Sequence, residues 1–267
     1  MFKISKKLIF EKSSDRLKQE SIINVINSFK SKKNNNLFFL LEQRFQWMQK
    51  YIRDADIGLE VGAGAGFSKY FLKCKKLFTS DCTNDIHLDF KNIDAQKTNF
   101  ENESFDFIIA SNMLHHTAHP VLFLREMHRI LKKRGKLIIF EPYVSLMYQI
   151  ITYLTKHEGY DFTKNIWDEK LPLNNENDPW DANDAISHLL FDKKIEFQKQ
   201  TNNIFEIIYE DFSEFLIFIN SGGVYSKSFY IPLNLYILKI VKCIDKFLIK
   251  IFPKIFALGR KIVLIKN

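Results

Sequence analysis

Short apolar runs alternate with helical patterns through the first half of the chain. Leu37–Ile52 is amphipathic, with Leu41, Phe45, Met48 and Ile52 on one helical face. The other predicted elements are strands at 57–61, 77–80, around Ile93, 105–110 and 136–140, and helices at 67–73 and 120–133. Strands that alternate with helices in this way indicate parallel βαβ units.

The second half of the chain departs from this alternation. Residues 143–190 carry clustered polar and aromatic side chains and predict an inserted cap, and 194–197 and 259–265 are then predicted as the sixth and seventh strands. We therefore expect an α/β fold with a doubly wound, Rossmann-like sheet of seven mostly parallel strands, a helical or loop cap and a C-terminal helix. The predicted parts are a basic N-terminal extension (1–36), a ligand-binding core (37–142), the cap (143–193) and a C-terminal part that completes the sheet (194–267).

The C-terminal helix has a regular row of lysines. Within residues 233–256, Lys239, Lys242, Lys246, Lys250 and Lys254 recur at spacings of three and four residues, which places them on one helical face. Three interpretations are open: a solvated lysine face on a packed helix, a helix that contacts an anionic membrane, or a dimer face.

The net charge of +8 is concentrated at the two ends of the chain. Residues 1–33 hold nine basic and three acidic side chains, residues 233–267 hold eight and one, and the middle is acidic. This distribution argues against a nucleic-acid partner, whose phosphates require a continuous basic surface. Three cysteines without metal-ligand spacing, and the lack of an apolar run long enough for a signal peptide or a membrane span, predict a cytoplasmic protein. A peripheral position at the inner membrane face is the alternative.

A glycine-rich turn follows the first predicted core strand. It reads Glu60-Val61-Gly62-Ala63-Gly64-Ala65-Gly66, and glycines at such a turn let a ligand approach the backbone. A dinucleotide site requires G-x-G-x-x-G with a pyrophosphate over the helix, whereas this turn has G-x-G-x-G preceded by an acid. An acid at this place favours the zwitterionic methionine end of a sulfonium cofactor over a nicotinamide.

Further candidate ligand contacts follow the next strands. Asp81 ends the second strand and is placed to accept ribose hydroxyls, although a turn-capping role is equally open. Asp94 and Ala95 follow the third strand, where a carboxylate can accept from an adenine amino group. Ser111 and Asn112 end the fourth strand, beside the expected reactive end of the cofactor.

These motifs, in this order, resemble the methyltransferase-domain family of class I S-adenosylmethionine-dependent enzymes. The resemblance covers roughly residues 50–145 and rests on LEVGAGAG, SDC, IDAQKTNF, SFDFIIASNMLHH and FLREMHRILKKRGKLIIFEPY. It departs from the family at Thr98-Asn99, where Leu-Pro is usual, and at Lys133-Arg134-Gly135, where Pro-Gly-Gly is usual. His157-Glu158, residues 178–183 (DPWDAN) and Ser221-Gly222-Gly223 further resemble a bacterial subgroup associated with surface-polysaccharide synthesis, which implies a sugar, sugar-phosphate or glycan-linked acceptor.

Methyl transfer to a hydroxyl calls for a base near the acceptor. His116 is the first candidate, because histidine exchanges protons near neutrality, and Glu141 and His157 come next. The predicted acceptor side comprises His115, Tyr143, Glu158, Asp161, Asp178, Trp180 and Asn183. For the cap the alternative is a solvated loop, and for Trp180 it is a core side chain. We expect no metal, because the spacing of His115, His116 and His119 matches no common site.

Other functions remain open from the sequence. A DNA amino-methyltransferase is disfavoured, because the position after the fourth strand reads Ser111-Asn112-Met113-Leu114 and not Asp/Asn-Pro-Pro-aromatic. The remaining alternatives are a methyltransferase of a lipid or quinone-type acceptor at a membrane surface, a non-catalytic nucleotide-binding protein on the same fold, and a dehydrogenase.

Overall fold

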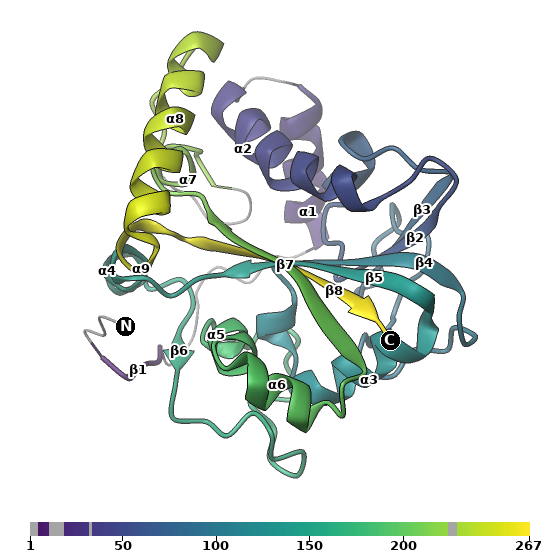
Figure 1. The fold of residues 1–267 in the computed structure, drawn as a ribbon. Helices are drawn as coiled ribbons and strands as arrows, with labels where there is room; N and C mark the ends of the chain where they lie inside the picture. The colour runs from purple at the N-terminus through teal and green to yellow at the C-terminus, as the bar shows by residue number, and fades with distance from the viewer. Residues whose placement is uncertain (1–4, 11–18, 32–33, 224–228) are drawn as a thin grey trace.

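The computed structural model describes residues 5–10, 19–31, 34–223 and 229–267, and a central sheet dominates it (Figure 1). The sheet has the order β3-β2-β4-β5-β8-β7. Its strands are β2 (Ile57–Val61), β3 (Lys76–Ser80), β4 (Phe105–Ser111), β5 (Leu131–Pro142), β7 (Phe205–Ser213) and β8 (Gly259–Lys266). The first four strands in this order run parallel, while β8 is antiparallel to both of its neighbours.

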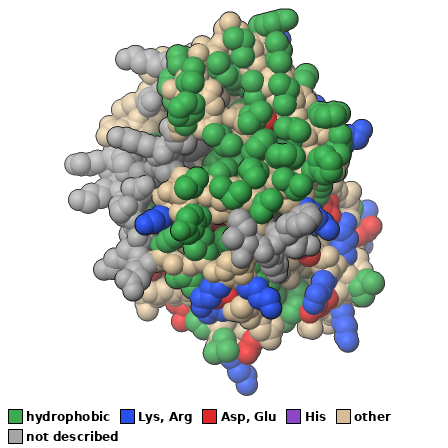
Figure 2. Space-filling model, turned by 90° about the vertical axis from the view of Figure 1, so that its left-hand side faces the viewer, with side chains coloured by type: hydrophobic (Ala, Val, Ile, Leu, Met, Phe, Trp, Pro, Cys, Tyr) green, Lys and Arg blue, Asp and Glu red, His purple; other side chains and the backbone are tan. Residues whose placement is uncertain are grey.

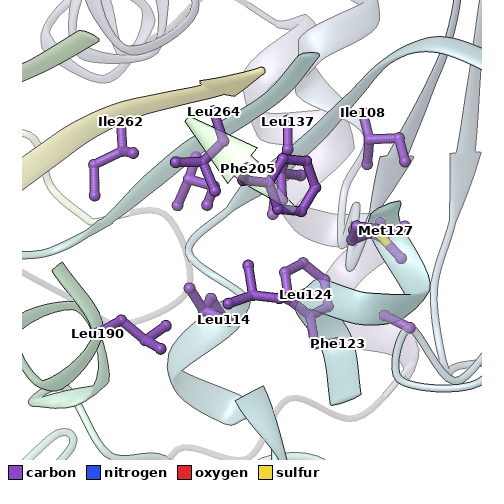
Figure 3. Close-up of a cluster of buried hydrophobic side chains, with 14 of the residues drawn as sticks. Ile108, Leu114, Phe123, Leu124, Met127, Leu137, Leu190, Phe205, Ile262 and Leu264 are labelled. Carbon is purple, nitrogen blue, oxygen red and sulfur yellow. The ribbon is translucent and has the colours of Figure 1, made fainter. Parts of the chain in front are cut away.

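Apolar side chains cover both faces of the sheet. Because successive side chains of a strand point to opposite faces, Ile108 and Ile109 of β4 join two different buried clusters, as do Leu137 and Ile138 of β5. Figure 3 shows the cluster that contains Ile108, Leu137 and Leu264, packed against Phe123, Leu124 and Met127 of helix α3.

Helices pack on both faces of this sheet (Figure 1). The cluster of Ile109 and Ile138 is covered by α1 (Gln19–Lys30), α2 (Asn35–Gln46) and the 3-10 helix η1 (Trp47–Tyr51). The cluster of Ile108 and Leu137 is covered by α3 (Pro120–Ile130), α5 (Ile186–Phe191) and α6 (Lys194–Gln200). The remaining helices are η2 (Phe67–Tyr70), η3 (Leu114–His116), α4 (Leu146–Thr155), α7 (Leu216–Ile219), α8 (Leu235–Ile251) and α9 (Pro253–Phe256).

A small second sheet joins the N-terminal part to the cap. β1 (Lys7–Leu8) pairs antiparallel with β6 (Tyr160–Asp161). A Cβ on the neighbouring Gly159 would lie 2.5 Å from the carbonyl oxygen of Leu8, so any larger residue there would push the two segments apart. Part of the predicted N-terminal extension therefore forms a wall of the cap.

The structure corrects three of the predicted elements. Residues 194–197 lie in helix α6, and the strand that occupies the sixth place is β7. Around Ile93 only a single bridge between Ser80 and Phe90 forms, so among the described residues the main sheet has six strands. The helix expected at 67–73 is only the 3-10 turn η2, because the chain enters β3 soon afterwards.

Two helix ends also differ from the prediction. α3 ends at Ile130, where β5 begins, and Arg134, with a φ of 61°, takes the left-handed conformation where the pairing of β5 with β4 shifts register. The lysine-rich helix is divided into α8 and α9, because Pro253 cannot continue α8 and begins a new turn. Among the described residues, no helix combines the length and the apolar character that a bilayer crossing requires.

Candidate active site

The glycine-rich turn lies at the carboxyl end of β2, as expected. Gly62, Gly64 and Gly66 have φ values of 62°, 50° and 68°, in the left-handed region that favours glycine. A Cβ on Gly62 would also lie 2.6 Å from the Cβ of Met113. The turn is held by a hydrogen bond from the Ala63 amide to the Ser80 carbonyl oxygen, 3.0 Å long.

Glu60 lies beneath this turn and not on its surface. Its side chain is buried and accepts a hydrogen bond from the Ser68 hydroxyl. Burial raises the pKa of Glu60 to about 8, and the nearby Asp81 adds to this effect, while the hydrogen bond from Ser68 opposes it. The carboxyl group is therefore largely protonated near neutral pH and braces the turn, which weakens the electrostatic argument that favoured a sulfonium cofactor.

Two carboxylates frame the turn on its open side. Asp81 accepts a hydrogen bond from the Gly64 amide through Oδ2, at 2.9 Å, so its side chain is fixed against the glycines. Asp94 is exposed and accepts from the Gln96 amide at 2.8 Å, next to the buried Ala95. The Ile93 amide donates to the Asp81 carbonyl oxygen at 2.9 Å, which ties the two acidic loops together.

The carboxyl end of β4 lies at the same edge of the sheet as the glycine turn. Ser111 is the last residue of the strand and is half-buried. Asn112 takes a left-handed φ of 52°, and its amide donates to the carbonyl oxygen of Phe140 at 2.7 Å. The chain therefore turns sharply as it leaves the sheet, and residues 113–116 pass over the carboxyl end of β5.

Glu141 organises this turn from below. Its fully buried carboxylate accepts hydrogen bonds from the amides of Met113, Leu114 and His115 at 2.9, 2.8 and 3.2 Å, and Oε2 also lies 2.6 Å from Nδ1 of His115. Because both oxygens are engaged and shielded from solvent, Glu141 does not fit the role of general base that the sequence suggested. It positions His115.

His115 and His116 differ sharply in their surroundings. Burial alone would lower the pKa of His115, but the carboxylates of Glu141 and Glu158 outweigh burial and hold the pKa well above its ordinary value. His116 is half-buried, and burial together with the positive charge of His115 lowers its pKa, an effect that Glu158 only partly offsets. His115 is therefore an imidazolium at neutral pH, whereas His116 is neutral.

The tautomer of His116 follows from its contacts. Nδ1 lies 3.2 Å from the carbonyl oxygen of Asp181, which can only accept, so Nδ1 carries the proton. The lone pair then resides on Nε2, which lies 3.8 Å from Oε1 of Glu158. His116 consequently presents a proton-accepting nitrogen beside Glu158.

Glu158 connects the histidines to the cap. Oε2 of Glu158 lies 3.6 Å from Nε2 of His115, and Oε1 lies 3.6 Å from Nε2 of His157. Burial would raise the pKa of Glu158, but the hydrogen bond to His115 and the positive charge of that imidazolium lower it below its ordinary value, so Glu158 is ionised. Nδ1 of His157 is buried without a hydrogen-bond partner among the described residues, which leaves it open to a ligand.

A pocket of about 280 Å³ opens at this point between the cap and β1. Of the residues predicted for the acceptor side or as bases, His157, Glu158, Asp161, Trp180 and Asn183 line it. Lys7 and Lys164 also line the pocket, although no sequence pattern marks them as site residues. Lys7 reaches it because β1 pairs with β6, and its Nζ lies 3.1 Å from Oδ2 of Asp161.

Two predicted acceptor residues, Tyr143 and Asp178, lie outside the pocket lining, and a third, Asn183, has a structural role. Tyr143 is buried against the rings of His188 and Phe212, away from the pocket lining. Asp178 accepts from the Trp180 amide at 3.2 Å and shapes the turn before that residue, outside the lining. Asn183 does line the pocket, but its buried side chain bonds to the backbone of Asp161 and Ala185, so its role is to hold the cap together.

The histidine and carboxylate groups lie close enough to hold a metal ion. Ligand atoms of His115, His116 and Glu158 all lie within 4.8 Å of one another. However, an imidazolium has no lone pair to donate, and His115 is held protonated by two carboxylates. The charge state of His115 therefore favours a proton-transfer network over a metal site.

Comparisons with known proteins agree with the geometry of the glycine turn and the neighbouring strand ends. Residues 59–139 match the profile of the methyltransferase domain family. These residues form a methyltransferase domain. No curated protein matches the sequence. The matched segment spans the glycine turn, both acidic loops, β4, the turn after it and β5 as far as Ile139.

Several solved structures align with most of the chain, and one of them reaches a TM-score of 0.50. A chain from the Haloferax volcanii complex of the Trm112 methyltransferase activator with a protein described as a methyltransferase is 11% identical, with a TM-score of 0.50, and the match covers 93% of this chain and 97% of that one. An S-adenosylmethionine-dependent methyltransferase from Archaeoglobus fulgidus is 13% identical over 85% of this chain and 93% of that one, with a TM-score of 0.49. A protein from Bacillus halodurans C-125 described as a methyltransferase is 16% identical over 84% and 96% of the two chains, with a TM-score of 0.44.

The match indicates a methyltransferase that uses S-adenosylmethionine, a donor that supplies an activated methyl group on a sulfonium. The methyltransferase domain has the features that such a cofactor requires. Gly62 and Gly64 of the turn are half-buried and carry no side chain, Asp94 is exposed, and Asp81 holds the turn from the end of the neighbouring strand. These residues, with Ser111 and Asn112, are the ones that would hold it.

Proposed function

We propose that this methyltransferase methylates a hydroxyl group of a sugar or glycan-linked acceptor, with His116 as the general base. The observation that carries the proposal is the position of Nε2 of His116. The His116 ring is neutral, the lone pair of Nε2 is free, and this nitrogen lies 3.8 Å from Oε1 of Glu158, a residue that lines the cap pocket. An acceptor hydroxyl in the pocket can give its proton to this nitrogen as the oxygen takes the methyl group.

The chemistry of the pocket supports a hydroxylated ring as the acceptor. Trp180 offers an aromatic face on which a sugar can pack, and Asp161, Asp181 and Asn174 offer oxygens and an amide in the lining. The positive side chains of Lys7 and Lys164 balance these acids, so the pocket is neither strongly basic nor apolar. This balance favours a sugar or sugar phosphate over a quinone or another apolar acceptor.

Glu158 and His115 assist the base through their charges. The ionised Glu158 lies within 3.8 Å of both ring Nε2 atoms and can stabilise His116 once it has gained a proton. His115, fixed by Glu141, keeps His116 neutral beforehand through its own positive charge. The pair therefore holds a base that is unprotonated at rest.

The test is methyl transfer from S-adenosylmethionine with a labelled methyl group to a panel of nucleotide sugars, sugar phosphates and glycan-linked phosphates. We expect an O-methylated sugar in at least one acceptor, identified by mass spectrometry. Trp180→Ala should raise the KM for that acceptor about tenfold or more, with Trp180→Phe close to the wild type. Transfer only to quinones or to amines would overturn the proposed acceptor class.

A further inference from the structure

The outward face of α8 is apolar along its whole length. Tyr236, Ile240, Ile244, Phe247 and Ile251 recur at spacings of three and four residues, so they share one side of the helix. Their exposed fractions are 74%, 45%, 43%, 64% and 49%. Figure 2 looks at the side of the molecule that carries α8 and shows hydrophobic side chains gathered over much of its upper part. Contiguous apolar surface of this kind marks an interaction site.

The orientation of α8 is fixed by its inner face. Leu238 and Ile249 are buried, and the buried carboxylate of Asp245 accepts hydrogen bonds from the amides of Leu216 at 2.9 Å and Ile217 at 3.2 Å. Rotation of the apolar face into the core would break these bonds. The exposure of the outward face is thus a consequence of how the helix is anchored.

Unpaired lysines border the apolar face on one side. Lys239, Lys246, Lys250 and Lys254 are exposed, and none of them forms an ion pair with another described residue. Lys246 and Lys250 also line a cleft that contains Glu210, Asp211 and Glu214. Arg260 and Arg44 neutralise Glu210 and Glu214, and Lys261 lines the same cleft as Asp211. Asp245 is the single acid of α8 and is buried, so the exposed part of the helix is purely cationic and apolar.

The apolar surface continues toward the active-site edge. α9 leads directly into β8, whose Gly259 pairs with Pro142 at the end of β5, and α4 begins a few residues beyond Pro142. On α4, Tyr153 and Leu154 are 66% and 72% exposed. In Figure 1 α4 and α9 lie together at the same side of the sheet as α8.

We propose that the outward face of α8, extended by α4, seats the protein on the surface of an anionic lipid bilayer. An amphipathic helix with a wide apolar face and lysines along its border lies in the interface, because the apolar side chains enter the acyl boundary while the lysines reach anionic headgroups. A second copy of the chain fits less well, since it would set one unpaired lysine row near another with no exposed acid on α8. The inference does not depend on the identity of the acceptor.

The experiment is co-sedimentation of the full chain with vesicles of phosphatidylcholine alone and of phosphatidylcholine mixed with phosphatidylglycerol. We expect binding to the mixed vesicles, weaker binding to the neutral ones, and a loss of binding as salt is raised. The double variant Ile240→Ser with Phe247→Ser should weaken binding about tenfold or more. Lys239→Gln with Lys250→Gln should reduce the preference for anionic vesicles.

The matched control is Ile86→Ser with Ile195→Ser, two isoleucines that are 82% and 86% exposed elsewhere on the molecule, and it should bind like the wild type. S-adenosylmethionine binding by each variant verifies that it is folded. Absence of binding to both kinds of vesicle would overturn the proposal, as would equal binding by the Ile240/Phe247 variant. A stable dimer of the wild type that the same variant dissociates would assign the face to a second copy instead.

Discussion

Nδ1 of His115 lies 2.6 Å from Oε2 of Glu141, and both side chains are buried at the junction of β5 and the turn after β4. This pair links the fold to the proposed chemistry. The carboxylate that fixes the backbone of residues 113–115 also holds the imidazolium whose charge keeps His116 neutral. Stability and proton transfer therefore depend on one contact.

The first prediction concerns stability and pH. The pKa of His115 is raised in the folded state, so its contribution to stability is fully present below the ordinary histidine pKa of about 6.5 and is lost as the pH rises through the raised value. Glu141→Gln should lower the free energy of unfolding by about 2 kcal/mol near pH 6, and this deficit should shrink at alkaline pH. Urea denaturation at several pH values measures it. The surface variant Glu176→Gln, which removes the exposed partner of His119, should show no such deficit, and a deficit for Glu141→Gln that is constant with pH would contradict the assignment.

The second prediction concerns the general base. His116→Gln should lower kcat about a hundredfold or more while S-adenosylmethionine still binds, because the variant cannot accept the acceptor's proton. The pKa of His116 is lowered, so wild-type activity should persist through the ordinary histidine range and fall only at more acidic pH. His115→Gln removes the adjacent positive charge and should shift this acidic limb to higher pH.

The pH–rate profile of each variant measures these effects, and His128→Gln on α3 is the control, since its contacts lie with Phe205, away from the pocket. An unchanged kcat in His116→Gln would remove His116 from the mechanism. If the acidic limb of the pH–rate profile is unchanged in His115→Gln, the charge of His115 does not set the pKa of His116.

The third prediction concerns cofactor binding at the glycine turn. Gly64→Arg should abolish measurable binding of S-adenosylmethionine and S-adenosylhomocysteine in isothermal titration, because Gly64 has a left-handed φ of 50° and faces Asp81. Far-UV circular dichroism should show a folded protein. NAD(H) should give no thermal stabilisation of the wild type, and a clear stabilisation by NAD(H) would revive a dehydrogenase.

The fourth prediction concerns metal ions. Incubation with a chelator followed by gel filtration should leave methyl transfer unchanged, because His115 is held as an imidazolium between Glu141 and Glu158. Activity is the readout, with bound metal measured by elemental analysis of the same sample. A loss of activity that one divalent ion restores would mean that His115, His116 and Glu158 form a metal site.

The parallel half of the fold was predictable because its strands are short, apolar and buried on both faces. β2, β3 and β4 begin and end within a residue of the predicted limits. The prediction of a strand at residues 194–197 was wrong. Charged and apolar residues alternate there as in a strand, but only Phe197 is buried and the segment forms a helix. β7 was missed although Phe205 and Ile207 alternate with Glu206, because its pairing with β8 joins distant parts of the chain.

The candidate site was predictable where its residues follow strand ends. The glycine turn, Asp81 and residues 111–116 lie at one edge because parallel strands end there together. The cap residues were harder to predict, because Tyr143 and Trp180 are equally plausible aromatic candidates in the sequence. Only their packing in the structure shows that Trp180 lines the pocket and Tyr143 does not. Lys7 could not be assigned, because its place depends on the pairing of β1 with β6.

The position of β8 has a consequence for how the protein is made. β8 lies between β5 and β7, and its Val263 and Leu264 belong to the cores on opposite faces of the sheet. During synthesis, β5 and β7 leave the ribosome before the strand that joins them, so the growing chain exposes apolar edges that it cannot yet pair. Closure of the sheet must wait until β8 is made, and a message or chain broken before β8 would yield a protein that aggregates and does not bind its cofactor.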